Sequence, residues 1–333
     1  MITPKVSFMK KPIVQNLLKY FLLITLVLVA AVFGILQPAF YNLNNIMDIL
    51  RTASVIGIMA LGCMLIMSTG ELNWCMGAQF TMAAGIVGRL MANAPEGAYV
   101  PVIILSLILT MFTGLLTGFF VIQVGVPSFI ASLAMETVMT GVNKLLCDGG
   151  TFFSPAWGDY FTAVGRGYLF DVIPLPVIAM LILAVISHFF YEKTATGRHL
   201  CAVGANETAS RQVGLNTGML KYLAFALSAL LCGVAGIIQS SISMNVSLSA
   251  GSELLMPALC TTMLGATFLK PGKYNVPGTA VAAILMILIQ NGVVSAGGSF
   301  YVKNLIQGAI CIVAVGIVAM VRTEGLPKVS FGN

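Results

Sequence analysis

The sequence predicts an all-α integral membrane protein with about ten transmembrane helices, folded as a single transmembrane domain over residues 1–333. Three observations support this prediction. Hydrophobic residues make up 58% of the chain and charged residues only 8%, whereas a soluble domain carries about 25% charged residues. The mean hydropathy of the chain is +0.98. Apolar stretches of the length that crosses a bilayer recur nearly from end to end, without the alternation typical of barrel strands.

The first apolar run covers residues 17–36. At ~1.5 Å per residue it is long enough to cross a bilayer core of ~30 Å. A cleaved signal peptide has a shorter apolar stretch, so we expect an uncleaved helix behind a cytoplasmic tail of residues 1–16. The later runs are expected to be helices too, because backbone groups in lipid must be satisfied within their own segment. These runs cover residues 54–69, 76–92, 100–121, 128–146, 172–191, 217–240, 255–268, 277–295 and 302–321.

The positive charges predict the orientation of these spans. When the spans alternate from a cytoplasmic N-terminus, the cytoplasmic side holds more Lys and Arg than the other side, in agreement with the positive-inside rule. The C-terminus is then cytoplasmic as well. The cytoplasmic set is Lys5, Lys10, Lys11, Lys19, Lys193, Arg198, Arg211, Lys221, Lys270, Lys273, Arg322 and Lys328, and the opposite set is Arg51, Arg89, Lys144, Arg166 and Lys303.

Two polar loops interrupt the apolar pattern, an external loop over residues 147–171 and a cytoplasmic loop over residues 192–216. Loops of this length usually have a function or are disordered. The two halves of the chain also show a short echo, because the stretch 68–72 after the second span resembles the stretch 249–254 after the seventh. The predicted topology places these stretches on opposite sides, as an inverted repeat of spans 2–5 and 7–10 would. Coincidence is the open alternative.

No catalytic or metal-binding pattern is present. The chain lacks a phosphate-binding G-x-x-x-x-G-K-[ST] loop, so it cannot hydrolyse ATP by the mechanism that uses this loop. His188 and His199 are expected to be interfacial or surface residues, and neither belongs to a metal-binding spacing. We therefore predict that the chain is not an enzyme and binds no metal or cofactor. It also lacks the basic and aromatic patch that would indicate nucleic acid.

Polar residues inside or beside the spans are the candidate substrate pathway. An ionised Glu136 in the middle of the fifth span would be costly, so it should be neutral, paired or facing water. Amide and aromatic groups suit a neutral hydroxylated ligand, and scarce buried Arg disfavours phosphorylated cargo. The alternative for each amide is a hydrogen bond between packed helices. The candidates are Glu71, Asn73, Trp74, Glu136, Asn245 and Asn291.

The most specific stretch lies in the cytoplasmic loop. Residues 206–212 are predicted to form a short polar helix that Asn206 caps and Gly214 ends. The loop resembles that of the ribose/simple-sugar permease family of ATP-binding cassette importers, which reads approximately G-R-x-x-x-A-x-G-x-N-x-x-A-x-R-x-x-G-[IL]. The matching residues are Gly197, Arg198, Ala202, Gly204, Asn206, Ala209, Arg211, Gly214 and Leu215.

Other stretches resemble the same family in the same order, among them residues 40–46, 53–62, 127–133 and 264–279, so the likeness covers nearly the whole chain. It implies the type II-like fold of an importer permease in a bacterial inner membrane. It also implies that Gly197, Arg198, Gly204, Asn206, Glu207, Ala209, Arg211 and Gly214 form the coupling contact with an ATP-binding subunit.

The implied partners are ATPase subunits that carry ATP and Mg, an external solute-binding protein, a second permease subunit and the lipid bilayer. The implied cargo is a small polar solute such as a monosaccharide. The chain departs from the family around residues 70–77, where Glu71 replaces a common Asp and Trp74 a small residue. The alternative from another class is a stand-alone secondary transporter or channel, which the ordered match in the loop does not favour.

Overall fold

A computed structural model describes residues 12–92, 98–153, 157–170, 172–270, 272–298 and 300–321 of the chain. Apart from one hairpin and one isolated bridge, the regular structure of these residues is helical, so the predicted all-α class is confirmed. In chain order the elements are α1 (Pro12–Leu36), η1 (Pro38–Tyr41), α2 (Leu43–Met67), α3 (Met76–Met91), α4 (Tyr99–Ile122), α5 (Ser128–Leu146), α6 (Asp159–Arg166), β1 (Tyr168–Leu169), β2 (Ile173–Pro174), α7 (Leu175–His188), η2 (Phe189–Lys193), α8 (Ala195–Ala205), α9 (Glu207–Gln212), α10 (Thr217–Ser243), α11 (Ala250–Gly265), α12 (Val276–Ser295) and α13 (Phe300–Val321).

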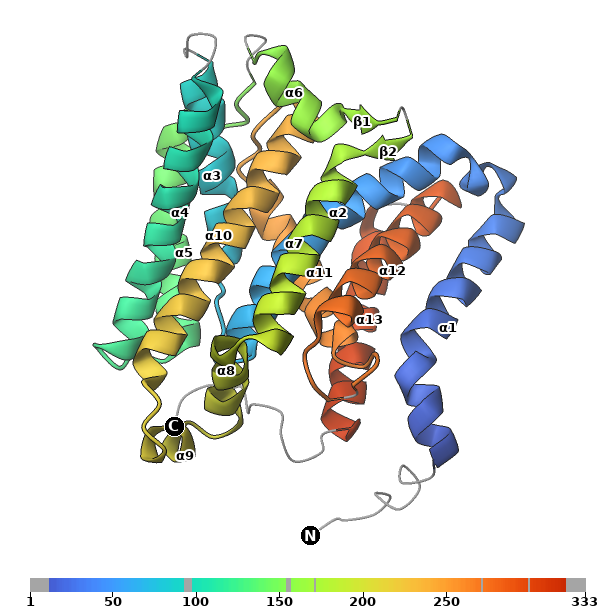
Figure 1. Cartoon of the computed structure of the whole chain (residues 1–333). Coiled ribbons are helices and arrows are strands. Elements are labelled where there is room, and N and C mark those ends of the chain that lie inside the picture. The colour runs from blue at the N-terminus through green and yellow to red at the C-terminus, as the bar shows by residue number, and fades with distance from the viewer. Residues whose placement is uncertain are drawn as a thin grey trace.

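The long helices form one bundle with α2 and α10 at its centre (Figure 1). Every residue of α2 from Ala53 to Met67 is buried. A helix that is apolar all round is stable only when other helices surround it. In this bundle α10, α11, α12 and α7 pack around α2, while α3 and α4 pack against α10. We call the two ends of the bundle the α6 end and the α9 end after the short helices that lie there (Figure 1).

The outer surface of the bundle is apolar. Large hydrophobic side chains are exposed along α1, α4 and α7, including Ile35 at 82%, Val100 at 64% and Val185 at 67%. Exposed apolar surface of this extent indicates an environment other than water. Five helical stretches are long and apolar enough to cross a membrane, namely α2, α4, α7 with η2, α10 and α12. The chain is therefore a multi-pass membrane protein, as predicted, while the number of crossings stays a prediction.

Each of the predicted spans overlaps a helix, but α2 begins well before the predicted start at residue 54. Its first turns carry Asn44, Asp48 and Arg51. These polar residues lower the local hydropathy, so the start of the helix could not be predicted from an apolar run. Asn42 starts the helix by accepting a hydrogen bond from the backbone N–H of Asn44 at 3.2 Å. The Arg51 Nη1 to Asp48 Oδ1 ion pair, at 2.9 Å, then holds two of these side chains on one face.

Two helices of the bundle, α3 and α11, are shorter than the five long apolar stretches. Each has 16 residues, and at ~1.5 Å per residue each is about 24 Å long, less than the ~30 Å of a bilayer core. Non-helical segments precede both, over residues 68–75 and 244–249. The helices therefore start inside the bundle, beside the long helices α2 and α10 that lead into them.

The predicted external loop over residues 147–171 packs onto the α6 end of the bundle. Trp157 is buried, and its indole N–H donates to the carbonyl oxygen of Gly88 at 3.0 Å. Phe152 forms an isolated bridge with Val246, which ties the loop to the segment after α10. Helix α6 lies against α10, where the backbone N–H of Gly165 donates to Ser241 Oγ at 2.7 Å. The described part of this loop is thus an ordered cap.

Candidate functional site

The predicted cytoplasmic loop between η2 and α10 holds two short helices rather than the single one predicted. The predicted helix is α9, and its cap is confirmed because Asn206 Oδ1 accepts the backbone N–H of Ala209 at 3.0 Å. Gly214 follows with φ of +86°, a conformation that glycine adopts freely. Helix α8 was missed because its sequence mixes apolar and polar residues without a strong period. Thr194 caps α8 by accepting the N–H of Gly197 at 3.1 Å.

The predicted coupling residues differ in burial. Gly197 is buried, and a side chain there would overlap the carbonyl oxygens of Phe190 and Tyr191. Its role is therefore to let α8 pack closely against η2. The exposed coupling residues are Arg198, Asn206, Ala209, Arg211 and Gly214, and the half-buried ones are Gly204 and Glu207.

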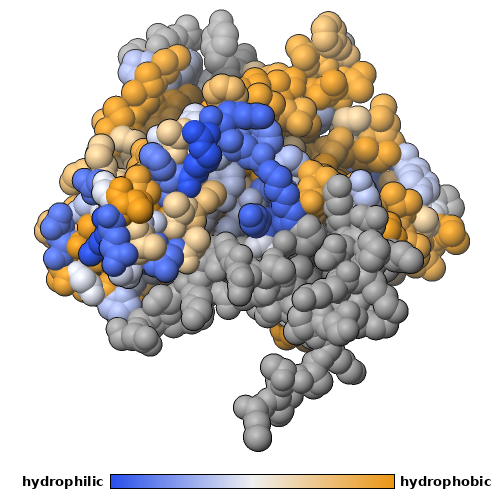
Figure 2. Space-filling view, turned by 60° about the horizontal axis from the view of Figure 1, so that its bottom comes forward, coloured by the Kyte–Doolittle hydropathy of each residue, from blue (hydrophilic) through white to orange (hydrophobic). Residues whose placement is uncertain are grey.

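The surface around α8 and α9 is polar. Figure 2 shows hydrophilic residues gathered on the α9 end, with hydrophobic residues on the flanks of the bundle. Two apolar side chains nevertheless stand out beside α9, because Val213 is 76% exposed and Met219 is 71% exposed. Exposed apolar side chains within a polar rim are typical of a protein-binding surface.

A chain of charges connects α9 to the interior of the bundle. Glu207 accepts from Arg211 at 2.8 Å and from Lys221 of α10 at 2.7 Å. The same Lys221 ammonium lies 2.6 Å from Glu71 Oε1, in the segment between α2 and α3. Arg211 also donates to Thr217 Oγ1 at 2.9 Å, which fixes α9 against the start of α10. We call Glu71, Lys221 and Glu207 the charge link.

The inner pair of the charge link, Lys221 and Glu71, is mostly shielded from water, whereas the Glu207 side chain is 34% exposed. The Lys221 and Glu71 side chains are 12% and 14% exposed. Removing one partner of a buried ion pair strands the other charge, which typically destabilises a protein by about 3–5 kcal/mol. Burial by itself would raise the pKa of Glu207, but the hydrogen bond from Lys221 and the nearby positive charges outweigh it and hold this pKa below the usual range. Glu207 is therefore charged at neutral pH.

The segment 68–75 holds three of the predicted pathway residues, and they point to different partners. Glu71 faces Lys221. Asn73 is fully buried, where its amide donates to Gln79 Oε1 at 3.0 Å and accepts from the N–H of Cys75 at 3.1 Å. Trp74 packs edge-on against Phe129 of α5, with ring centroids 5.5 Å apart. The amide of Asn73 thus shapes the segment, while the Trp74 ring contacts α5.

Helices α3 and α11 begin at the same depth and touch through two glycines. A side chain built on Gly77 would lie 2.8 Å from the carbonyl oxygen of Gly251. A side chain built on Gly251 would overlap the carbonyl oxygen of Gly77 and lie 2.6 Å from Thr81 Oγ1. The two helix starts can approach this closely only because neither position carries a Cβ atom. Only Gly251 of this contact belongs to the short echo of the sequence, because Gly77 lies five residues beyond the stretch 68–72.

Helix α5 carries polar groups on a face that nothing else in the described chain covers. Thr137, Thr140, Gly141 and Lys144 are exposed, and Glu136 is half-buried beside them. A side chain built on Gly141 would have nothing within 4 Å. Polar and ionisable side chains rarely face lipid. This face of α5 is therefore suited to a water-filled pathway or to another subunit rather than to hydrocarbon.

The structure does not bring all the predicted pathway residues together. Asn245 lies after α10, where its carbonyl oxygen accepts from Ser243 Oγ at 3.1 Å. Asn291 lies in α12 and accepts from Ser295 Oγ at 3.2 Å. Both contacts are near the α6 end, away from the Glu71 and Lys221 pair. Their assignment to a substrate pathway stays a prediction.

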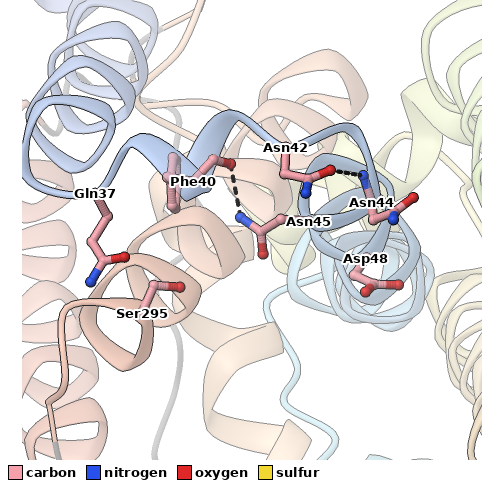
Figure 3. Close-up of a pocket in the computed structure, with 7 residues that line it drawn as sticks. All are labelled: Gln37, Phe40, Asn42, Asn44, Asn45, Asp48 and Ser295. Carbon is pink, nitrogen blue, oxygen red and sulfur yellow. Dashed lines mark hydrogen bonds between the residues drawn. The ribbon is translucent and has the colours of Figure 1, made fainter.

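A polar pocket of about 410 Å³ lies at the α6 end, where η1 and the first turns of α2 meet the end of α12 (Figure 3). Two of its amides are used locally, since Asn42 caps α2 and Asn45 Nδ2 donates to the carbonyl oxygen of Phe40 at 2.9 Å. Amide, hydroxyl and carboxylate groups of this kind can bind hydroxylated molecules. The lining residues are Gln37, Phe40, Asn42, Asn44, Asn45, Asp48 and Ser295.

Neither this pocket nor the contacts of Lys221 were predicted from the sequence. The pocket had a local signal, because polar residues cluster between two apolar runs at residues 42–48. Lys221 had a weaker one, since it is a single charge near the start of an apolar helix. Among the described residues, no three His, Cys, Asp or Glu side chains lie together in a way that could hold a metal ion.

The family model described as "branched-chain amino acid transport system / permease component" matches residues 45–315. The ribose import permease protein of Escherichia coli strain K12 is 30% identical over 296 residues, which cover 88% of this chain and 91% of that protein. The corresponding ribose protein of Haemophilus influenzae is 29% identical over 88% of this chain and 90% of its own length. The xylose transport system permease protein of Haemophilus influenzae is 26% identical over 91% of this chain and 96% of its own length.

Proposed function

The chain belongs to the family of branched-chain amino acid transport system permease components, and from this membership we propose that it is the membrane-spanning subunit of an ATP-binding cassette importer for a sugar. The observation that carries the proposal is the exposed docking helix α9, capped by Asn206 and joined to the bundle through Glu207 and Lys221. The chain is a transport subunit and not an enzyme. ATP and Mg belong to a separate partner subunit.

The partners follow from the two ends of the bundle. ATPase subunits bind the exposed residues of α8 and α9 from the cytoplasm, and Val213 and Met219 add apolar contact area. A solute-binding protein delivers cargo at the α6 end, onto the described part of the cap, residues 147–153 and 157–170. Both termini are cytoplasmic in this orientation, in a bacterial inner membrane. The polar pocket of Figure 3 then faces the outside.

A second permease subunit, identical or related, covers the exposed polar face of α5. Glu136, Thr140 and Lys144 are unsuited to lipid and lie on the part of α5 that no other described element covers. Two such faces opposite each other would enclose a polar pathway at the subunit interface. Trp74 contacts α5 through Phe129, so the segment 68–75 reaches the edge of this pathway. Glu136 is then a pathway group that stays in contact with water.

The two halves of the chain act as an inverted repeat, with α2 to α5 matching α10 to α13. The support is the paired arrangement of a long helix, a break and a short helix in each half, and the contact between Gly77 and Gly251 at the two short helix starts. Broken helices at matching places are typical of transporters that alternate between inward-facing and outward-facing states. Counting both short helices gives the ten membrane segments that the sequence predicts.

The cargo is a small hydroxylated solute, a monosaccharide or a similar molecule. Relatives named for ribose and xylose import support this class. The amide-rich spans and the scarcity of buried Arg support a neutral solute over a phosphorylated one. A stand-alone secondary transporter or channel would explain the helices, but not the docking loop.

Purified chain, ATPase subunits and binding protein, reconstituted in proteoliposomes, are expected to accumulate solute only when ATP is present on the ATPase side. An uncoupler should leave this accumulation unchanged, because no proton gradient drives it. Affinity purification of the tagged chain should recover both partners. Accumulation of solute by the chain alone, with no hydrolase present, would contradict the proposal and favour a secondary transporter.

Replacing Trp74 with valine is expected to change which solutes the complex transports. The indole ring lies against Phe129, where the family commonly has a small residue, so its removal widens the edge of the proposed pathway. Uptake of a panel of pentoses, hexoses and nucleosides measures the change. The matched control is Trp157→Phe, which alters the other tryptophan in the cap at the α6 end and should keep the selectivity. Unchanged selectivity in Trp74→Val would count against this placement.

A further inference from the structure

We propose that Lys221 is a positioning residue that transmits displacement of the docking helix α9 to the segment 68–75, and so to the pathway side of α5. The inference rests on the proposed function, because it needs an ATPase subunit that moves α9. It goes further by naming the contact through which that motion enters the membrane domain. The charge link of Glu71, Lys221 and Glu207 is the structural basis.

Lys221 connects two segments that are remote in sequence. Its Nζ atom lies 2.7 Å from Glu207 Oε2 on α9 and 2.6 Å from Glu71 Oε1 in the segment before α3. One ammonium group therefore binds the docking helix and the interior segment together. Arg211 strengthens the docking side, because it binds both Glu207 and Thr217.

Burial makes this connection stiff. The Lys221 and Glu71 side chains are only 12% and 14% exposed. Little water can therefore reach either charge to take the place of its partner. Opposite charges attract more strongly in such a low-dielectric setting than in water. When Glu207 moves, the ammonium group must either follow it or leave one carboxylate without a partner. The arrangement favours a concerted shift of all three groups.

The segment 68–75 carries the shift onward. Glu71 is followed by Leu72, whose backbone N–H donates to Ser128 Oγ at the start of α5 at 3.3 Å. Trp74 then packs against Phe129 of the same helix. Movement of Glu71 therefore acts directly on α5, whose exposed polar face borders the proposed pathway.

A second ion pair at the α9 end provides a comparison. Lys270, in the turn after α11, binds Glu192 at 2.8 Å, but the lysine side chain is 55% exposed and neither residue is paired with the segment 68–75 in the described structure. Exposed pairs contribute little, commonly ~0–1 kcal/mol. Lys270→Met therefore removes a lysine at the same end of the bundle without touching the charge link.

The experiment follows the environment of Trp74 in the assembled complex. The chain has two tryptophans, so labelling it with 5-fluorotryptophan gives two fluorine resonances, and Trp157→Phe assigns them. The labelled chain is reconstituted with unlabelled ATPase subunits, and a non-hydrolysable ATP analogue is added. We expect the Trp74 resonance to shift in the wild type and in Lys270→Met, and the shift to be lost in Lys221→Met, with equal amounts of bound ATPase in all three.

Glu71→Gln provides a second variant if Lys221→Met does not fold, because it keeps the side-chain shape and removes only the charge. It should also lose the shift. A wild-type shift in either variant would overturn the proposal, as would a wild-type complex in which the analogue moves only the Trp157 resonance. Failure of the wild-type chain to bind ATPase subunits would instead overturn the proposed function, and with it the proposed role of Lys221.

Discussion

Replacing Gly251 with alanine is expected to force α3 and α11 apart and so to destabilise the chain. The new Cβ atom would overlap the carbonyl oxygen of Gly77 and lie 2.6 Å from Thr81 Oγ1. A backbone carbonyl cannot rotate away as a flexible side chain can, so α3 and α11 must separate. Overpacking of this kind costs about 1–3 kcal/mol, occasionally more. Thermal unfolding in detergent, followed by size-exclusion chromatography, measures the loss.

Gly308→Ala is the matched control, because Gly308 also lies in a helix and a side chain there would have nothing within 4 Å. Its unfolding temperature should stay the same or rise slightly, since alanine favours helices over glycine by about 1 kcal/mol. Equal unfolding temperatures for Gly251→Ala and Gly308→Ala would show that the helix starts do not meet as described. The proposed inverted repeat would then lose its central contact.

Replacing Ala209 with tryptophan is expected to weaken assembly with the ATPase subunits strongly while leaving the chain folded. Ala209 lies on the exposed side of α9, and the charge link lies on the other side through Glu207. A bulky ring on a helix that inserts into a partner groove prevents close packing, at a cost of about 1–3 kcal/mol for each docking site. With two sites in the complex, recovery of ATPase subunits should fall at least about tenfold.

Ala296→Trp serves as the control for added bulk, because Ala296 is exposed at the end of α12, at the opposite end of the bundle. Affinity purification of this variant should recover ATPase subunits at the wild-type level. Normal recovery with Ala209→Trp would mean that α9 is not the docking helix. Unfolding temperatures of both variants, measured on the isolated chain, should match that of the wild type.

These variants separate two parts of one mechanism. Ala209→Trp blocks the outer contact of α9, whereas Lys221→Met leaves that contact intact and cuts the inner one. In the first variant little complex should form, and in the second a complex should form in which ATP no longer moves Trp74. The distinction matters because a permease that assembles without responding to ATP would hold its pathway in one state.

Sequence patterns predicted the membrane class and the positions of most helices. The runs that became α4, α5 and α12 were located to within a residue or two, because a lipid-facing or fully enclosed helix must be apolar over most of its length. The start of α2 was placed too late, because polar residues over 43–53 form helix beyond the apolar run. Helix α8 was missed because its mixed apolar and polar sequence has no strong period. Its packing against η2, which the sequence does not reveal, stabilises the helix.

Helix α9, the proposed docking helix, is the part of the candidate site that the sequence determined by itself. Asn206 and Gly214 act on neighbouring backbone groups, and such caps and left-handed glycines are specified by local residues. The tertiary structure alone decided that Glu71 faces Lys221, that Gly77 meets Gly251, and that one face of α5 remains uncovered. These contacts join residues far apart in the chain, and hydropathy specifies that a helix is buried without specifying which neighbour it meets.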